Sequence, residues 1–547
     1  MQRGPGQSDS QRVEIDMGEI EDILDRAALG PLSPEERQKL RQTIQTLAWL
    51  QGEISRKNAS LSQLRQQLFG KPSTEKTREV LGERTKESEG KEDADGEPPQ
   101  RDLPQEEVTP REGHGRNAAA DYPGAERVKI QHESLKAGDP CPEDGCDGKL
   151  YRLPEPRVLV CVRGHAPLSA TVYEREALRC ALCGKVFVAG LSDALHNCKY
   201  DATAGAMIGL LKYGTGLPFN RLEGLEGNLG TPLPAATQWE IVNVAAKDLA
   251  PAYDELRRQA AQGEVIHNDD TSMTILAHVK ENRTKKEGER YGTFTTGMVA
   301  TVKDHRVAVF STGRNHAGEN LTKLLEEREG QLPPPIQMCD GLDRNEPDEP
   351  FETILANCLG HGRRHFVDVV ADFPKEVRHV LETLREVYRH DAQARQAKMS
   401  PEERLRHHQE HSRPLMDGLK TWFQEQFDQK KIEPNSGLGD AIRYMQKRWD
   451  KLTLFLRVPG APIDNNICER ALKKAILHRK NALFFKTENG AKVGDVFMSL
   501  IHTAELNAVN AFRYLTELLR HAKQVADDAE AWMPWNYLAT LARARSP

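Results

Sequence analysis

Acidic side chains occupy three places in the sequence where acids are uncommon. Asp269 and Asp270 stand inside an apolar, β-rich run. Asp340 directly follows the short apolar run 335–339, and Glu469 stands directly before a strongly cationic run over 470–480 that contains no acid. Strands are depleted in acids unless something binds them. Carboxylate oxygens are the ligands that Mg²⁺ prefers, so these acids indicate metal-dependent phosphate chemistry.

Glu469 lies in the stretch 463–485, whose spacing predicts a helix. Asp464 is expected to cap the free amides of its first turn. The apolar positions form one buried stripe, made of Ile467, Ala471, Leu472, Ala475 and Ile476. The cations off this stripe are Arg470, Lys473, Lys474, His478, Arg479 and Lys480. Taken alone, the helix is better explained as a solvated basic surface with one salt-bridged glutamate, because charge runs are common.

The elements that must position the acids follow from periodicity. Strands are predicted over 264–276, 291–302 and 307–311, a helix over about 318–327, and a short buried strand over 335–339. Three strands, a helix and a fourth strand, with acids on the first and fourth, is the order expected of an RNase H-like sheet. Neighbouring residues of a strand face opposite sides, so only one of Asp269 and Asp270 can point into a site.

Cysteines form a second candidate site. Nine occur in the chain, and six of them lie between positions 141 and 198. Cys141 and Cys146, with Cys180 and Cys183, form two Gly-containing turns that suit a tetrahedral structural Zn²⁺ site. The alternative ligands are Cys161, His165, His196 and Cys198. Buried cysteines without a metal remain the competing interpretation.

The rest of the chain divides by composition. A capping signal at Ser33–Glu36 opens a heptad pattern to Leu68, with Asn58 at a seam position, which predicts a coiled coil or else a single amphipathic helix. Residues 71–125 are charged and rich in Gly and Pro, which predicts a disordered linker. Helices over 202–213, 220–227 and 234–256 fit a helix-turn-helix, although such helix pairs are frequent in ordinary helical domains.

Together these features predict a multidomain α+β protein. The expected parts are a flexible N-terminus (1–32), a coiled coil (33–70), a linker (71–125), a zinc-binding module (126–200), a helical DNA-binding region (201–260), an RNase H-like core (261–374 and 459–504) with a helical insertion (375–458), and a C-terminal helical region (505–547).

Overall charge and hydropathy set limits on function. The net charge of -6 argues against a uniformly basic nucleic-acid coat, but local fields decide whether DNA can dock. No apolar run approaches the roughly 20 residues that span a bilayer, and the N-terminus lacks a signal-peptide core. The sequence therefore predicts a soluble, cytoplasmic protein with no membrane partner.

Several motifs give the chain a resemblance to transposases of the insertion sequence 66 family. The resemblance extends from about residue 40 to the C-terminus, without the linker. It rests on the paired cysteines and on Leu64-Arg-Gln-Gln-Leu-Phe-Gly-Lys-Pro-Ser-Thr-Glu-Lys76, Lys212-Tyr-Gly-Thr-Gly-Leu-Pro-Phe-Asn-Arg221, His267-Asn-Asp-Asp-Thr271, Asp340-Gly341, His361-Gly-Arg-Arg-His-Phe366, Asp464-Asn-Asn-Ile-Cys-Glu-Arg470 and His478-Arg-Lys-Asn-Ala-Leu-Phe484. The chain departs from the family pattern at Asp270, where a Glu is usual, and around Arg344-Asn345.

The resemblance implies an RNase H-like catalytic domain with the triad Asp269, Asp340 and Glu469. These acids would hold two Mg²⁺ ions, or Mn²⁺, roughly 3.5–4 Å apart, for cleavage at element ends and joining of the 3′-hydroxyl to target DNA. DNA phosphates would be contacted by Arg470, Lys473, Lys474, Arg479 and Lys480. The expected partners are element and target DNA, a second protomer bound through the coiled coil and accessory proteins of the element, in a bacterial cytoplasm and at its nucleoid.

Three alternatives share part of this pattern. An RNase H-like nuclease that cuts without joining would carry the same triad. An inactive, transposase-derived DNA-binding protein would retain the zinc and helical modules. A zinc hydrolase built on the cysteines is disfavoured, because thiolate-rich zinc sites are usually closed and structural.

Overall fold

The structure is a computed structural model that describes residues 33–38, 40, 129, 134–142, 146–151, 166–179, 186–190, 199–286 and 288–545. The chain divides into two compact units, one of Met1–Gly90 with Ala356–Asp464 and one of Lys91–Leu355 with Asn465–Pro547. Most of the predicted coiled coil and all of the predicted linker lie outside the described residues. The helix start predicted at Ser33 is confirmed, since Ser33 Oγ accepts from the Glu36 N–H at 3.2 Å and Glu36 Oε2 accepts from the Ser33 N–H at 2.8 Å.

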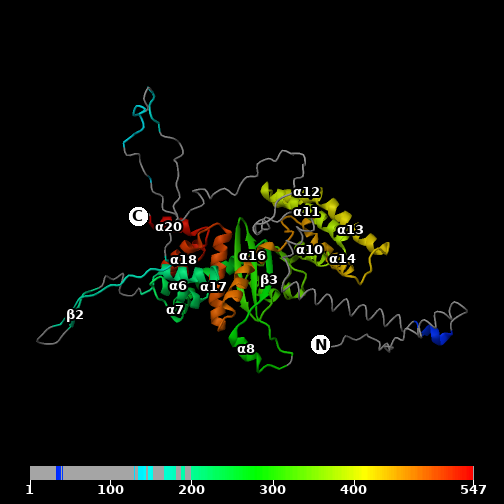
Figure 1. Cartoon of the computed structure of the whole chain (residues 1–547), viewed down its shortest axis with the longest axis horizontal. Helices are drawn as coiled ribbons and strands as arrows, with labels where there is room; N and C mark the ends of the chain where they lie inside the picture. The colour runs from blue at the N-terminus through cyan, green and yellow to red at the C-terminus, as the bar shows by residue number, and fades with distance from the viewer. Residues whose placement is uncertain are drawn as a thin grey trace, which may run out of the picture. The chain divides into compact units, whose positions relative to one another are not determined.

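A mixed five-stranded sheet with the order β5-β4-β3-β6-β7 forms the centre of the larger unit (Figure 1). Its strands are β3 (Val265–Ser272), β4 (Phe294–Val302), β5 (His305–Gly313), β6 (Ile336–Cys339) and β7 (Ile354–Asn357). β3, β4 and β5 are antiparallel neighbours, whereas β6 runs parallel to β3. The chain is therefore α+β, as the sequence predicts. The predicted order of three strands, a helix and a fourth strand is confirmed, except that a short helix stands between the first two strands.

The strand predicted over 264–276 extends too far at its C-terminal end. β3 stops at Ser272, and the helix α8 (Leu276–Asn282) begins where the strand was expected to finish. Beyond β3 the backbone changes partner, because Phe485 donates to Thr274 O at 2.9 Å and its carbonyl accepts from the Leu276 N–H at 2.9 Å. The following segment, Leu276–Asn282, contains Leu, Ala, Lys and Glu, and these residue types favour a helix over a longer strand.

The other elements of this unit are mostly helices. They include the three helices predicted over 201–260, which are confirmed as elements. The remaining elements are α5 (Ala202–Gly209), a π-helical turn (Leu210–Gly214), α6 (Phe219–Asn228), α7 (Ala235–Ala261), α9 (Ala317–Leu325), a 3₁₀ turn (Asp343–Asn345), α16 (Asn466–Ala482), α17 (Glu488–Leu506), α18 (Ala511–Arg520), α19 (Ala522–Asp527), a 3₁₀ turn (Glu530–Trp532) and α20 (Tyr537–Arg545). Their apolar faces and the sheet share one core, which includes Leu249, Val299, Phe310, Phe497 and Tyr514.

The outer edge of β5 is closed by α17. Side chains one helical turn apart on α17 and at its C-cap accept hydrogen bonds from alternate backbone N–H groups of β5, which would otherwise have no strand to bond. The bonds join Thr312 to Asp495 (2.7 Å), Phe310 to Ser499 (2.9 Å), Ala308 to Thr503 (3.0 Å) and Arg306 to Asn507 (3.2 Å). Four residues along α17 and two residues along β5 cover a similar distance, so each helical turn meets the next of these N–H groups of the strand edge.

From Leu359 to Leu456 the smaller unit consists of helices and their connections. Its elements are α10 (Leu359–Asp368), α11 (Pro374–Gln396), α12 (Pro401–His411), α13 (Arg413–Asp428), α14 (Gly437–Lys447), α15 (Trp449–Leu452) and a 3₁₀ turn (Leu454–Leu456). Leu381, Phe423 and Met445 are among its fully buried side chains. Among the helices that the structure describes, none has the length and apolar character to cross a membrane.

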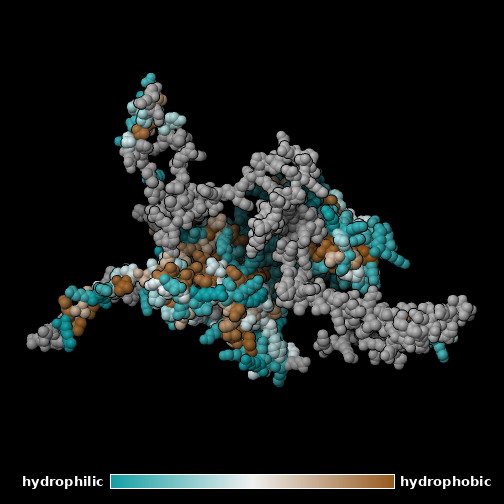
Figure 2. Space-filling model, in the orientation of Figure 1, coloured by the Kyte–Doolittle hydropathy of each residue, from teal (hydrophilic) through white to brown (hydrophobic). Residues whose placement is uncertain are grey.

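A small hairpin precedes the larger helices. β1 (Ala177–Arg179) pairs with β2 (Val186–Val188) in antiparallel register. Leu178, Val186 and Val188 are exposed, and brown atoms mark this segment in Figure 2. The described part of this hairpin therefore lacks an apolar core of its own.

Candidate active site

Asp269 of β3 and Asp340, which directly follows β6, lie at the same level of two adjacent parallel strands. The last register pair of β3 and β6 is His267 with Met338, and each aspartate stands two residues beyond its member of that pair. The acids predicted from their positions in the strands therefore reach one end of the sheet together. Neither depends on a long loop for its placement.

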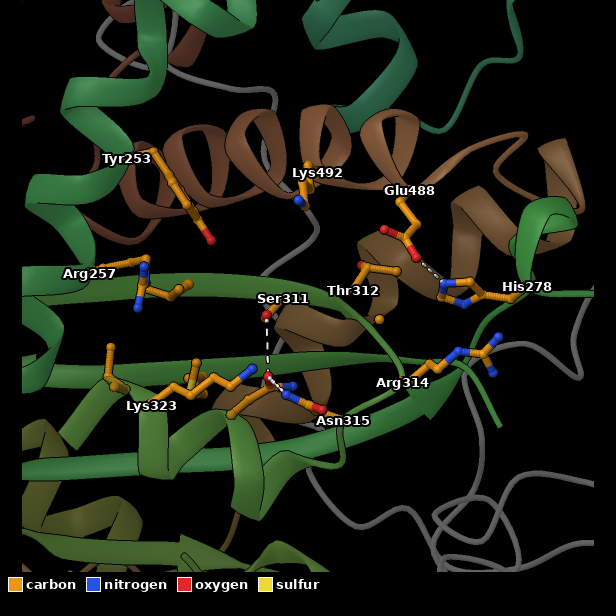
Figure 3. A pocket seen from close by; sticks show the side chains of 15 residues that line it. Tyr253, Arg257, His278, Ser311, Thr312, Arg314, Asn315, Lys323, Glu488 and Lys492 are labelled. Atoms are coloured by element: carbon orange, nitrogen blue, oxygen red, sulfur yellow. Dashed lines mark hydrogen bonds and ion pairs between the residues drawn. The ribbon is translucent and has the colours of Figure 1, made fainter. Parts of the chain in front are cut away.

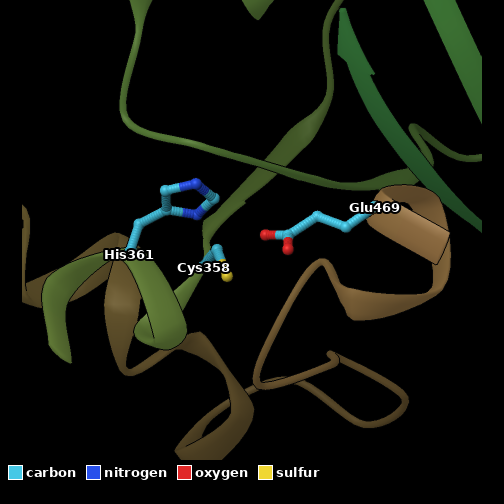
Figure 4. Close-up of side chains that lie close together, drawn as sticks. All are labelled: Cys358, His361 and Glu469. Carbon is cyan, nitrogen blue, oxygen red and sulfur yellow. The ribbon is translucent and has the colours of Figure 1, made fainter. Parts of the chain in front are cut away.

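Glu469 reaches the same region from α16. Across the antiparallel pair, Asp269 faces Gly297 of β4. A Cβ atom at Gly297 would lie 3.0 Å from Leu472 Cδ2 and 3.7 Å from Cys468 Sγ, so α16 packs directly on this strand. The Cys468 thiol also lies 3.1 Å from the Gly297 carbonyl. The absent side chain at Gly297 therefore lets the first turn of α16 approach the sheet, and Figure 4 shows Glu469 on that turn.

Electrostatics link the three acids. Burial and the charge of Asp340, with smaller contributions from the charges of Asp270 and Glu469, together raise the pKa of Asp269 to about 7. The Asp270 N–H, which donates to Asp269 Oδ1 at 2.8 Å, opposes this shift. Like charges this close favour protonation or a bound cation, so the cluster suits a hard metal ion.

Asn345 and Asn465 position the acids, although the sequence did not identify either as a site residue. Asn345 Nδ2 donates to Asp340 Oδ1 at 2.5 Å, and the Asn345 carbonyl accepts from Asn268 Nδ2 (2.8 Å) and from Gln337 Nε2 (2.6 Å). Asn345 is almost fully buried. The position had been noted only as a departure from the family pattern, and a buried Asn has no signal in an isolated sequence.

Asn465 fixes the start of α16. Its Oδ1 lies 3.1 Å from His267 Nδ1, and its Nδ2 donates to the Asn268 carbonyl at 3.1 Å. Asn465, not Asp464, occupies the N-cap position, so the predicted helix start is one residue too early. The side chain of Asn465 ties the helix to β3 instead of capping it.

Asp270 faces away from the cluster. Its Oδ2 lies 2.8 Å from His316 Nδ1 and its Oδ1 lies 3.4 Å from Arg344 Nη2, with the side chain only 2% exposed. Consecutive strand residues therefore separate as expected, and Asp270 has a structural ion-pair environment. His316 and Arg344 are partners that the sequence could not have indicated.

The five predicted DNA-binding cations fall into two groups. Arg470, Lys473 and Lys480 are exposed on α16 and have no ion-pair partner among the described residues. Lys474 Nζ lies 2.9 Å from Glu505 Oε2, and Arg479 Nη1 donates to Ser272 Oγ at 2.7 Å. Because residues four and seven apart share a helix face, Lys473 and Lys480 lie on the face of Glu469.

His478 does not belong to the charged face on which it was predicted. It is buried, and its ring stacks on Phe485 (centroid separation 4.2 Å) and Tyr213 (6.3 Å). Burial, together with the charge of Lys212, lowers the pKa of His478 to about 3. The two motifs that contain Lys212 and His478 thus meet in the core and anchor the second half of α16.

The predicted zinc ligands are described only in part. Cys141 and Cys146 are free thiols, and the Cys141 N–H donates to the Gly148 carbonyl at 2.8 Å. The backbone at Gly148, then the Cys141 side chain, lowers the pKa of Cys146. Cys180 and Cys183 lie outside the described residues, as do Cys161, His165, His196 and Cys198. In the smaller unit, Cys358 and His361 lie at the start of α10 (Figure 4).

Comparison with known proteins adds independent information. Residues 198–493 match the family described as Transposase IS66 family, which is more than half of the chain. Uncharacterized protein y4hP of Sinorhizobium fredii (strain NBRC 101917 / NGR234) is 28% identical over 355 residues, covering 60% of each protein. Uncharacterized protein y4jD of the same organism is 34% identical over 190 residues, covering 34% of this chain and 36% of that relative. The matches thus span less than two thirds of these relatives.

Proposed function

Because this chain belongs to the Transposase IS66 family, we propose that it is a DNA transposase in which Asp269, Asp340 and Glu469 catalyse cleavage at element ends and joining to target DNA. The observation that carries the proposal is the placement of Asp269 and Asp340 at the same level of two adjacent strands, with Glu469 on the turn of α16 that packs against β4. The strand order and the placement of the acids also match those expected of an RNase H-like domain.

The donor set fits a divalent cation. All three side chains offer hard carboxylate oxygens, and the raised pKa of Asp269 reflects like charges that a cation would offset. Bound Mg²⁺ or Mn²⁺ would activate the attacking oxygen and stabilise the leaving 3′-oxygen. Asp269 and Asp340 would hold it from the sheet, and Glu469 from α16.

The protein's own part in the reaction is positioning. Asn345 fixes the Asp340 carboxylate, and the contacts of Asn465 set the height of Glu469 above β3. A DNA phosphate at this end of the sheet would meet the exposed Arg470, Lys473 and Lys480. Such contacts give affinity and salt dependence rather than sequence choice.

The remaining parts of the chain would supply recognition and assembly. We propose that the 126–200 module binds Zn²⁺ through Cys141, Cys146, Cys180 and Cys183. That module and the 201–260 helices would recognise element ends, while the 33–70 segment would pair protomers. The exposed β1–β2 hairpin favours a metal, because a module without an apolar core needs another source of stability.

The test is a joining assay with labelled element ends, a target plasmid and Mg²⁺. Wild-type protein is expected to give joined product, and Asp269→Asn and Glu469→Gln proteins are expected to give none. Asp304→Asn, at an exposed acid in the β4–β5 turn, is the matched control and should join normally. Joining at the wild-type rate by either triad variant would falsify the proposal. Cleaved ends without joined product would identify a nuclease instead.

A further inference from the structure

A cavity lies on the opposite side of the sheet from Asp269, Asp340 and Glu469. It measures about 430 Å³, and the residues that line it include Met298 of β4 and Ser311 of β5 (Figure 3). Gly297 faces α16 and the triad, so the next residue, Met298, faces the other side. The cavity walls come from α7, α8, α9 and α17. A ligand bound here could not touch Asp269.

The lining of the cavity is cationic. Four basic side chains, Arg257, Arg314, Lys323 and Lys492, line it against one acid, Glu488. The Glu488 carboxylate is engaged, since its Oε1 lies 2.6 Å from His278 Nε2. The cavity therefore presents an excess of positive charge to a ligand.

Of the four cations, two are already in ion pairs and two are available for a ligand. Arg257 pairs with Glu327 at 2.6 Å, and Arg314 pairs with Glu281 at 2.7 Å. Lys323 of α9 and Lys492 of α17 are exposed and have no ion-pair partner in the described part of the chain. Figure 3 shows them on opposite sides of the cavity. A multivalent anion between them could contact both ammonium groups.

Polar donors lie between these lysines. Ser311 Oγ and Asn315 Nδ2 share the Asn320 Oδ1 acceptor at 3.5 and 3.4 Å. Both separations are longer than those of strong hydrogen bonds, so either donor can turn to a ligand oxygen. By contrast, Thr312 and Tyr253 are committed to Asp495 (2.6 Å) and to the Phe310 carbonyl (2.9 Å).

We propose that this cavity binds a phosphate-bearing ligand, held by Lys323 and Lys492 with Ser311 and Asn315 as neutral donors. A phosphate offers several charged oxygens to donors that approach from different directions, which matches this arrangement. The volume is within the range of small-ligand sites and exceeds the needs of a single phosphate. The ligand is the sugar-phosphate backbone of a DNA strand on this side of the sheet or a free nucleotide. The proposal does not depend on catalysis by the triad.

The test uses the full chain carrying Glu469→Gln, so that no DNA is consumed. Binding of a short labelled duplex is measured by fluorescence anisotropy, and binding of dATP and pyrophosphate by calorimetry. The test variant is Lys323→Glu with Lys492→Glu, and the matched control is Lys303→Glu with Lys523→Glu, two exposed lysines outside the cavity. Lys323→Gln with Lys492→Gln provides a milder second variant.

Duplex affinity about tenfold below that of the control, with a salt slope smaller by about 2, would identify the DNA backbone as the ligand. Loss of dATP and pyrophosphate binding alone would identify a free nucleotide. Both cavity variants binding all three probes as the control does would overturn the proposal. Because binding is scored without catalysis, failure of the joining assay leaves this result unaffected.

Discussion

Adjacent aspartates in one strand have opposite environments. Asp269 has like charges around it and a raised pKa, whereas Asp270 lies against His316 and Arg344. The two differ because strand neighbours point to opposite faces. At the scale of single residues, the carboxylate without cationic neighbours is the one suited to hold a metal ion.

The raised pKa of Asp269 predicts a pH dependence of stability. Its folded-state pKa of about 7 exceeds the usual value near 4, so the folded protein binds the proton more tightly than the unfolded chain. Stability should therefore fall as pH rises from about 4 to 7, by up to about 4 kcal/mol from this group. Urea unfolding in chelator should show a weaker decline for Asp269→Asn. Parallel pH profiles of the two proteins would contradict this explanation.

Asn345 should matter for activity more than for folding. Asn345→Ala removes the donor to Asp340, and loss of such a supporting contact typically lowers activity 10- to 100-fold. The joining rate and the free energy of unfolding are the measurements. The control is Asn489→Ala, whose amide donates to Asn243 on the surface. An Asn345→Ala protein as active as this control would show that the loop does not position Asp340.

At the scale of elements, the approach of α16 to the sheet depends on Gly297. Gly297→Val suits a strand but would push Leu472 and the first turn of α16 outward. Misplacement by about 1 Å can reduce catalysis about 100-fold, and overpacking should lower stability by about 1–3 kcal/mol. Joining rates and denaturant midpoints would measure both effects. Gly418→Ala, in open space inside α13, should leave the joining rate unchanged and should not lower the midpoint, because Ala favours a helix by up to about 1 kcal/mol over Gly.

The sequence indicates the three acids because each stands where an acid is uncommon. Asp269 lies inside a predicted strand, Asp340 directly follows one, and Glu469 lies beside a run of cations. It indicates none of the residues that support them. Gly297 and Asn465 act through neighbours far away in sequence. Asn345 is only five residues from Asp340, but its own position is fixed by a bond from Asn268, which is distant in sequence. The end of β3 was mispredicted for the same reason, since Phe485 takes over its backbone pairing. The catalytic role of the acids stays a prediction.

At the scale of the whole molecule, an acidic chain is proposed to bind DNA. Its net charge is -6, so affinity must come from local fields such as that of α16. Changing Arg470, Lys473 and Lys480 to Gln should reduce the salt slope of DNA binding by up to about 3. Lys474→Gln should leave the slope unchanged, because Glu505 already pairs with that lysine. Titrations at several salt concentrations would show equal slopes if the exposed cations do not meet phosphates.

The closure of β5 by α17 has a consequence for how copies of the protein behave when they are close together. An open strand edge is a template on which another chain can add a strand, and this is a route to aggregation. Four backbone N–H groups of β5 are instead bonded to Asp495, Ser499, Thr503 and Asn507. The opposite edge is β7, only four residues long. Copies held close together, as on the DNA that this chain is proposed to bind, are therefore expected to lie side by side without pairing their sheets.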